Sequence, residues 1–154
     1  MGLVLAALAG CSLPSLNDRP ASEALPPAQT RDTRLGEVIH PEVSRRPDLS
    51  GIATLEDPLD AFAARALLAQ ASERSLDVQY YIWQDDMAGN LLLHALYRAA
   101  QRGVRVRLLL DDNGIAGMDD ALAALNRHPN IEVRLFNPFV LRRPKALGYL
   151  GDFT

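Results

Sequence analysis

Hydrophobic residues recur along the middle of the chain with two alternating periods, which predict helices and strands in turn. Helical spacing of apolar residues follows Asp57-Pro58, a favourable helix start, and continues to about Arg74. Residues 76–83 then alternate in the manner of a strand, with the apolar positions at Leu76, Val78, Tyr80 and Ile82. A second helix is predicted over residues 88–102, with its apolar side formed by Leu91, Leu92, Ala95, Leu96 and Ala99.

The same succession continues to residue 136. Residues 104–110 form a predicted strand that ends in three leucines, which is typical of a buried sheet centre. A short helix over residues 118–127 and a strand over residues 131–136 follow. Helices of this length allow crossover connections, which are right-handed almost without exception. The sequence therefore predicts an α/β fold: a βαβαβ unit with a mostly parallel sheet flanked by helices.

Each predicted strand runs into a turn rich in acidic or amide side chains. These turns are Gln84-Asp85-Asp86, Asp111-Asp112-Asn113-Gly114 and Asn137-Pro138-Phe139. The carboxyl ends of neighbouring parallel strands lie at one edge of a sheet, where ligands usually bind. Two interpretations stay open. In the first, these side chains cap the elements that follow: Asp85 or Asp86 the second helix, and Asp112 or Asn113 the next turn. In the second, the carboxylates form a metal- or phosphate-dependent pocket.

The first eleven residues form an apolar run that ends at Cys11, the only cysteine of the chain. The run is too short to span a membrane, which takes about twenty apolar residues, and it is similar to the end of a secretory signal. Residues 8–11, Leu-Ala-Gly-Cys, match the bacterial lipoprotein processing box, although no Lys or Arg precedes the run. We therefore expect lipidation of Cys11. Ser12, rather than Asp, follows the cysteine, and the resemblance to proteobacterial lipoproteins then implies a location at the outer membrane, facing the periplasm. The alternative is an apolar terminus with an incidental free cysteine.

A proline-containing segment separates this run from the predicted domain. It has six prolines between residues 12 and 50 and no sustained apolar period, so we expect a disordered tether. The predicted organisation is a signal segment at residues 1–11, a linker at 12–54 and an α/β domain at 55–154.

Composition and motifs exclude several classes of function. A formal net charge of -3 lacks the basic clusters of nucleic-acid-binding proteins. The glycine-rich phosphate-binding motifs of nucleotide-binding proteins are missing. The three histidines, His40, His94 and His128, have no nucleophile or carboxylate at a telling spacing. We expect His94 at the core or its boundary. The sequence nominates no catalytic residue, no metal site and no cofactor.

Three segments read together resemble one family. They are Ser75-Leu-Asp-Val-Gln-Tyr-Tyr-Ile-Trp83, residues 103–114 (Gly-Val-Arg-Val-Arg-Leu-Leu-Leu-Asp-Asp-Asn-Gly) and residues 130–139 (Asn-Ile-Glu-Val-Arg-Leu-Phe-Asn-Pro-Phe). Their order and spacing are similar to the amino-terminal half-domain of bacterial phospholipase D superfamily proteins of the cardiolipin synthase type. The resemblance covers about residues 55–139.

The resemblance implies phosphatidyl transfer without a metal. In the family, two His-x-Lys-x-x-x-x-Asp motifs meet between two half-domains, and one histidine forms a phosphohistidine while the other protonates the leaving alcohol. The implied partners are a membrane phospholipid of the phosphatidylglycerol type and, through the lipid anchor, the membrane itself. Tyr80 and Asp111 would line or brace the pocket.

The chain departs from the family at the catalytic motifs. The residues two places after its histidines are Glu42, Leu96 and Asn130, and its only lysine, Lys145, follows Arg143 by two places. Neither motif is present, and the first would be expected shortly beyond Thr154. We therefore expect an amino-terminal fragment of a phosphatidyltransferase, inactive alone. The alternative is a non-catalytic, lipid-anchored α/β domain that binds a partner.

Overall fold

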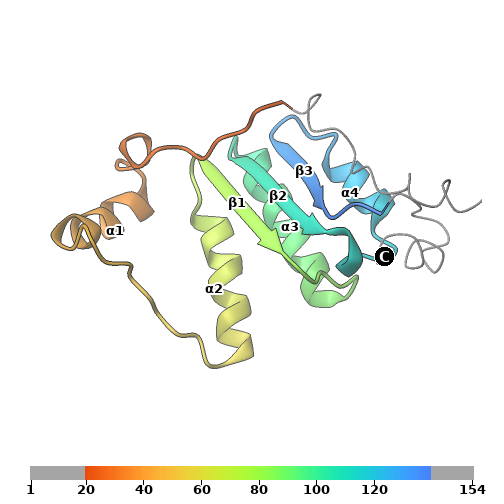
Figure 1. The fold of residues 1–154 in the computed structure, drawn as a ribbon, viewed down its shortest axis with the longest axis horizontal. Coiled ribbons are helices and arrows are strands. Elements are labelled where there is room, and N and C mark those ends of the chain that lie inside the picture. Colours follow the sequence, from red (N-terminus) through yellow and green to blue (C-terminus); the bar gives the residue numbers. More distant parts are fainter. Residues whose placement is uncertain (1–19, 140–154) are drawn as a thin grey trace, which may run out of the picture. The chain divides into compact units, whose positions relative to one another are not determined.

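Alternating helices and strands dominate the computed structural model, which describes residues 20–139 (Figure 1). The elements belong to one compact unit, Ala24–Pro138. Its strands are β1 (Ser75–Tyr80), β2 (Arg105–Asp111) and β3 (Ile131–Phe136). Its helices are α1 (Arg34–Arg45), α2 (Pro58–Ala71), α3 (Met87–Gln101) and α4 (Asp119–Leu125), with short 3-10 turns at Pro27–Gln29 and Asp112–Gly114.

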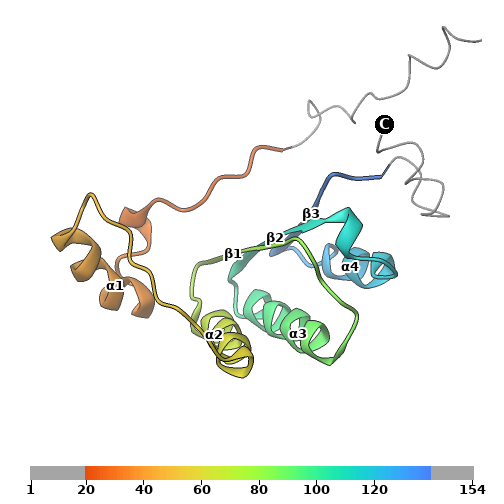
Figure 2. The same ribbon diagram turned by 60° about the horizontal axis from the view of Figure 1, so that its bottom comes forward.

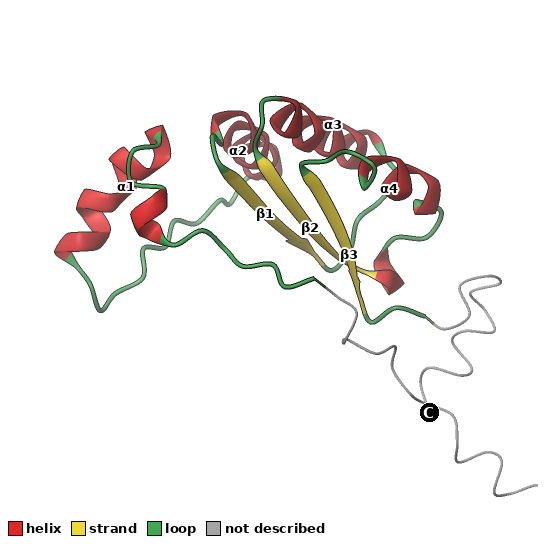
Figure 3. Ribbon diagram, turned by 90° about the horizontal axis from the view of Figure 1, so that it is seen from above, coloured by secondary structure: helices red, strands yellow, loops and turns green. Residues whose placement is uncertain are grey.

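The three strands form a parallel sheet in the order β1-β2-β3. Ser75 is paired with Arg105 and Val106 with Ile131, and the register continues without a break from these pairs. Helices α2, α3 and α4 all lie on one face of this sheet (Figures 2 and 3). This is the arrangement that successive right-handed crossovers in one direction produce. The predicted α/β class and its parallel βαβαβ unit are confirmed.

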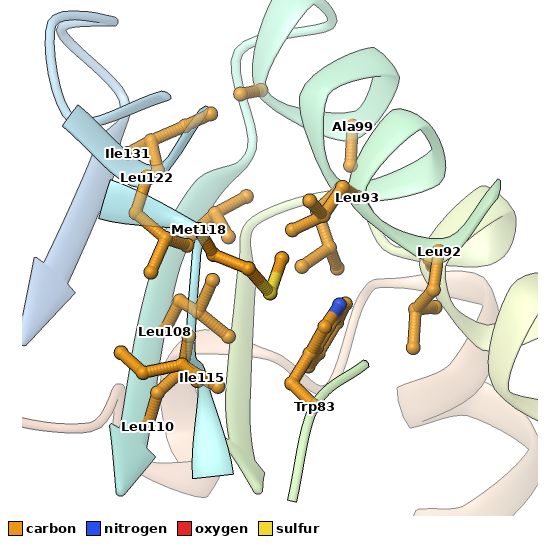
Figure 4. Close-up of a cluster of buried hydrophobic side chains, with 14 of the residues drawn as sticks. Trp83, Leu92, Leu93, Ala99, Leu108, Leu110, Ile115, Met118, Leu122 and Ile131 are labelled. Atoms are coloured by element: carbon orange, nitrogen blue, oxygen red, sulfur yellow. The ribbon is translucent and has the colours of Figure 1, made fainter. Parts of the chain in front are cut away.

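The hydrophobic core fills the space between the sheet and these helices (Figure 4). Alternate residues of the central strand, Val106, Leu108 and Leu110, are fully buried. They pack in one cluster with side chains from α3 and α4, such as Leu93 and Leu122. Because side chains alternate across a strand, the residues between them face the other side of the sheet.

The helix ends follow the capping rules of the sequence. Asp57 Oδ1 accepts hydrogen bonds from the backbone N–H groups of Leu59 (2.8 Å) and Asp60 (3.1 Å) at the start of α2. Beyond the end of α3, Gly103 has a φ of 91°, the left-handed conformation that favours glycine. The predicted helix start at Asp57-Pro58 is confirmed.

The second face of the sheet carries charged side chains in a cross-strand row. Arg107 Nε and Nη2 donate to the two carboxylate oxygens of Asp77, at 2.7 and 2.5 Å, and Glu132 is the neighbour of Arg107 on β3. The hydrogen bonds from Arg107 lower the pKa of Asp77, against an opposing effect of desolvation. Hydrogen bonds to Asp77 in turn raise the pKa of Arg107.

Helix α1 corrects the prediction of a tether without secondary structure. Thr33 Oγ1 caps the helix by accepting from Gly36 N at 3.0 Å. Nearby, Arg34 Nε pairs with Glu73 Oε1 at 2.7 Å, and Arg74 pairs with Asp32. These contacts join residues about 40 positions apart, so reasoning from the local pattern of prolines missed them.

Two further corrections concern the packing of α3 and the end of β1. On α3, Leu93 is buried while Leu91 is 52% exposed, and His94 is exposed and not at the core boundary. Strand β1 ends at Tyr80 and not at residue 83, which leaves Ile82 exposed and Trp83 buried. The chain turns after Tyr80, so the alternation expected from a longer strand no longer applies.

Candidate functional site

The carboxyl ends of β1 and β2 are joined by a direct contact between the loops that follow them. Trp83 N donates to the carbonyl oxygen of Gly114 at 3.0 Å. A Cβ atom at Gly114 would lie 2.2 Å from the carbonyl oxygen of Tyr81, which is far too close. Glycine at this position therefore lets the two loops approach each other.

Asp111 organises the end of the central strand. Its side chain is buried, and Oδ1 accepts a hydrogen bond from Asn113 N at 2.9 Å. Its Oδ2 lies 3.5 Å from Nδ2 of Asn137, which follows β3. Asp111 thus caps the turn Asp112–Gly114, whereas the sequence assigned that role to Asp112 or Asn113. Asp112 is fully buried.

The acidic residues after β1 serve the start of α3. Asp86 Oδ1 accepts from Gly89 N at 2.8 Å, and Asp85 Oδ1 accepts from Asn90 Nδ2 at 2.9 Å. The capping interpretation is therefore confirmed for Asp86. Across residues 20–139, no group of three or more His, Cys, Asp or Glu side chains is placed to hold a metal ion. The geometry of the described turns gives the acidic-pocket interpretation no support.

A pocket of about 350 Å³ opens at this edge of the sheet. It is lined by residues 81–85 from the β1–α3 loop and by Asn113, Gly114 and Ala116 from the loop after β2. Gln84, Asp85 and Asn113 give it a carboxylate and two amides. Among the described residues, the lining contains neither histidine nor lysine, the two residue types that the resemblance assigns to attack on the phosphodiester and to binding of its charge.

Tyr80 lies beside a smaller pocket, of about 150 Å³, between the start of α3 and α2. Its ring packs edge-to-face against Trp83, with ring centroids 4.7 Å apart. The guanidinium of Arg65 lies 5.9 Å from the centre of the Tyr80 ring, within reach of a cation–π interaction. Tyr80 lines this smaller pocket and Asp111 fixes the loop beside the larger one. Their roles in binding a ligand stay predictions.

Trp83 is the residue of the site that sequence reasoning missed. It is 4% exposed and lines both pockets. Its indole Nε1 is buried and has no hydrogen-bond partner in the described part of the chain. The strand pattern placed Trp83 on the polar side, and only the early end of β1 turns it inward.

The histidines lie on separate elements and do not converge. His40 Nδ1 is 2.8 Å from Ser44 Oγ within α1, and His94 is exposed on α3. His128 packs against Tyr97, with ring centroids 5.5 Å apart. Cys11, Arg142, Arg143 and Lys145 lie outside the described residues. No helix in residues 20–139 is both long and apolar enough to cross a membrane.

Comparison with known proteins relates this chain to the cardiolipin synthases. The chain is 59% identical over 121 residues to cardiolipin synthase C of Escherichia coli, a match that covers 79% of this chain and 26% of that protein. It is 39% identical over 124 residues to an uncharacterized protein of Helicobacter pylori (79% and 24%). It is also 27% identical over 120 residues to a cardiolipin synthase of Oceanobacillus iheyensis (68% and 25%). This chain is therefore a homologue of the cardiolipin synthases, and the predicted relationship to phospholipase D-like proteins is confirmed.

The match has a limited extent. The chain spans about a quarter of the length of these relatives. No family model matches the chain. A solved structure of an archaeal chromatin protein aligns with a TM-score of 0.45 and 15% identity, over 68% of this chain and 42% of that one. This weak similarity carries no argument about function.

Proposed function

We propose that this chain forms the amino-terminal part of a phosphatidyltransferase that acts on membrane phospholipids, and that it is inactive by itself. The observation that carries the proposal is the 59% identity to cardiolipin synthase C, combined with a pocket at the edge of the sheet whose described lining has no histidine and no lysine. Its contribution is the pocket wall formed by the loops after β1 and β2. The histidine and lysine side chains that hold and attack the phosphodiester come from other polypeptide.

The proposed substrate class follows from the similarity to the cardiolipin synthases. A phospholipid of the phosphatidylglycerol type presents hydroxyl groups, and Gln84, Asp85 and Asn113 can donate to and accept from hydroxyls. A carboxylate without a neighbouring cation in the lining disfavours the phosphate itself. The phosphate therefore lies towards the groups that the other polypeptide supplies.

A chimera tests the proposal directly. This chain replaces the matching quarter of E. coli cardiolipin synthase C, and cardiolipin is measured by thin-layer chromatography in cells without other cardiolipin synthases. We expect the chimera to make cardiolipin, and a pocket variant, Asn113→Ala combined with Gln84→Ala, to make at least tenfold less. A chimera that is folded and abundant but makes no cardiolipin would refute the proposal.

A lipid anchor at Cys11 is part of the same proposal. It is supported by the processing box at residues 8–11 and by the position of the only cysteine. The anchored chain would face the periplasm from the outer membrane. Labelling cells with radioactive palmitate tests this, because wild-type protein should take up label and a Cys11→Ser variant should not. Equal labelling of both proteins would refute the anchor.

The second candidate function is a non-catalytic domain that binds a partner. The observation that favours it is the continuous buried core of the βαβαβ unit, which includes residues from three helices and from β2 and β3. Co-purification with a fragment of the E. coli relative that lacks its matching quarter separates the two candidates. A chain that stays monomeric and does not bind the fragment supports the independent domain, whereas a stable complex supports the incomplete enzyme.

A further inference from the structure

Apolar side chains of α1 and α2 lie exposed on the described part of the chain. Between residues 34 and 68, no large apolar side chain is buried. We use the name α1–α2 apolar set for six of these residues. They are Leu35 (38% exposed), Val38 (70%), Ile39 (55%), Val43 (54%), Leu59 (78%) and Leu67 (60%).

The members of this set share one side of each helix. On α1, Leu35 lies three and four residues before Val38 and Ile39, and Val43 lies four residues after Ile39. On α2, Leu59 and Leu67 are eight residues apart. Residues with these spacings lie on the same face of a helix. Exposed apolar residues gathered in this way mark interaction surfaces in soluble proteins.

The position of α1 is fixed at its first turn. Arg34 Nε donates to Glu73 Oε1 at 2.7 Å, and Arg34 N donates to Glu73 Oε2 at 3.2 Å. Arg74 pairs with Asp32 in the preceding turn. At Gly36 a Cβ would lie 1.9 Å from the carbonyl oxygen of Thr30, so the turn closes tightly on the helix. These contacts connect the first turn of α1 to residues 73 and 74 of the chain.

Charge argues against a lipid bilayer as the partner. Residues 34–68 carry four arginines and six carboxylates, a formal net charge of -2. Glu42 lies on α1 next to Val43 and is paired with Arg45 at 2.9 Å and Arg46 at 3.8 Å. Helices that bind anionic bilayers instead carry an excess of Lys and Arg on their polar face. A protein surface is the better match for a mixed set of charges around apolar residues.

We infer that the α1–α2 apolar set packs against polypeptide corresponding to the other three quarters of the cardiolipin synthase relatives, whether on the same chain or on a separate one. The relatives supply the reason, because this chain matches only 24–26% of their length. The inference rests on the proposed function for the identity of the partner. It adds that α1 and α2, and not only the edge of the sheet, hold the two parts together.

Stability measurements in two contexts test the inference. Ile39→Asp and Leu67→Asp are introduced into the isolated chain and into the chimera with E. coli cardiolipin synthase C. The matched control is Leu91→Asp on α3, because Leu91 is 52% exposed and does not belong to the set. In the isolated chain we expect all three variants to melt within about 2 °C of the wild type, because exposed substitutions change stability little.

In the chimera we expect Ile39→Asp and Leu67→Asp to lower the melting temperature by at least about 4 °C, because each would bury a charge in an interface. We expect Leu91→Asp to leave the melting temperature unchanged. A second readout uses the isolated chain and a tagged fragment of the E. coli relative without its matching quarter, produced in the same cells. Wild type and Leu91→Asp should co-purify with the fragment, and the other two variants at least tenfold less.

Neither readout depends on turnover. The inference can therefore fail while the proposed function holds, and the proposed function can fail while the inference holds. Equal melting of all chimeras together with equal co-purification would overturn the inference. A vesicle result would also overturn it. If the isolated wild-type chain sediments with phosphatidylglycerol vesicles and its Ile39→Asp variant does not, a bilayer covers the set. If the wild-type chain self-associates and Ile39→Asp abolishes this, the set binds a second copy of the chain, and the inference is overturned as well.

Discussion

Single residues of the chain differ sharply in their tolerance to change, and two glycines show this best. Gly114 lies where a Cβ would meet the carbonyl oxygen of Tyr81 at 2.2 Å, whereas a Cβ at Gly51 would meet no atom within 4 Å. Backbone atoms cannot yield as a flexible side chain can. The loop after β2 can therefore lie against the loop after β1 only because residue 114 has no side chain.

Gly114→Ala tests this contact. We expect it to reduce the free energy of unfolding by about 1–3 kcal/mol, the cost of overpacking, and to disturb the pocket between the two loops. Gly51→Ala is the control and should leave stability within about 0.5 kcal/mol of the wild type. Urea denaturation followed by tryptophan fluorescence measures both variants. Equal stability of Gly114→Ala and the wild type would show that the loops do not approach as described.

The ion pair between Asp77 and Arg107 gives a second prediction, on pH. The pKa of Asp77 is lowered in the folded chain, below an unfolded value of about 3.9. Its contribution is therefore present above the unfolded pKa and is lost as pH falls through the folded pKa. Because the Asp77 side chain is 43% exposed, we expect Asp77→Asn to cost under about 1 kcal/mol at pH 7.

The pH dependence of that difference is the measurement. The gap in stability between wild type and Asp77→Asn should close as the pH is lowered from about 5 to below the folded pKa, because Asp77 then becomes neutral. A gap that stays constant or widens over this range would contradict the assignment of the ion pair.

At the scale of the elements, the sequence predicts the central strand and the capped helices well. The strands β2 and β3 and the starts of α2 and α3 depend on local signals: an apolar run, an Asp cap and a glycine at the helix end. Helix α1 was missed although it has local signals, a Thr33 cap and apolar residues at helical spacing from Leu35 to Val43, because the prolines of the segment were read as a tether. Its ion pairs with Glu73 and Arg74 could not be read from the local pattern. Trp83 was placed on the polar side because the early end of β1 has no signal in the alternation.

Two neighbouring leucines of β2 test which face of the sheet the helices cover. Leu108 is 1% exposed beneath the helices, and Leu109 is half-buried on the second face. We expect Leu108→Ala to reduce the free energy of unfolding by about 2–5 kcal/mol and Leu109→Ala by less than half as much. Thermal unfolding followed by circular dichroism measures both. Equal losses would mean that both faces are covered to a similar extent.

At the scale of the whole molecule, the candidate site was predicted in part. The polar turns after the strands do meet at one edge, where Asp111 contacts the loops after β2 and β3. The pocket itself could not be predicted, because it depends on Trp83 and on the close approach at Gly114. The family could be recognised because each of its three segments is a continuous stretch of sequence. The chemistry could not be completed, because the histidine and lysine of the family motif are not in this sequence.

In the proposed function, the chain builds one wall of a phosphatidyltransferase site and lacks the histidine and lysine that attack and hold the phosphodiester. The most direct test incubates the purified chain with phosphatidylglycerol vesicles and follows release of glycerol, with and without the tagged fragment of the E. coli relative. We expect no release above background from the chain alone, and release when the fragment is present. Turnover by the chain alone, at a rate that follows its concentration and survives repeated purification, would refute the proposed function.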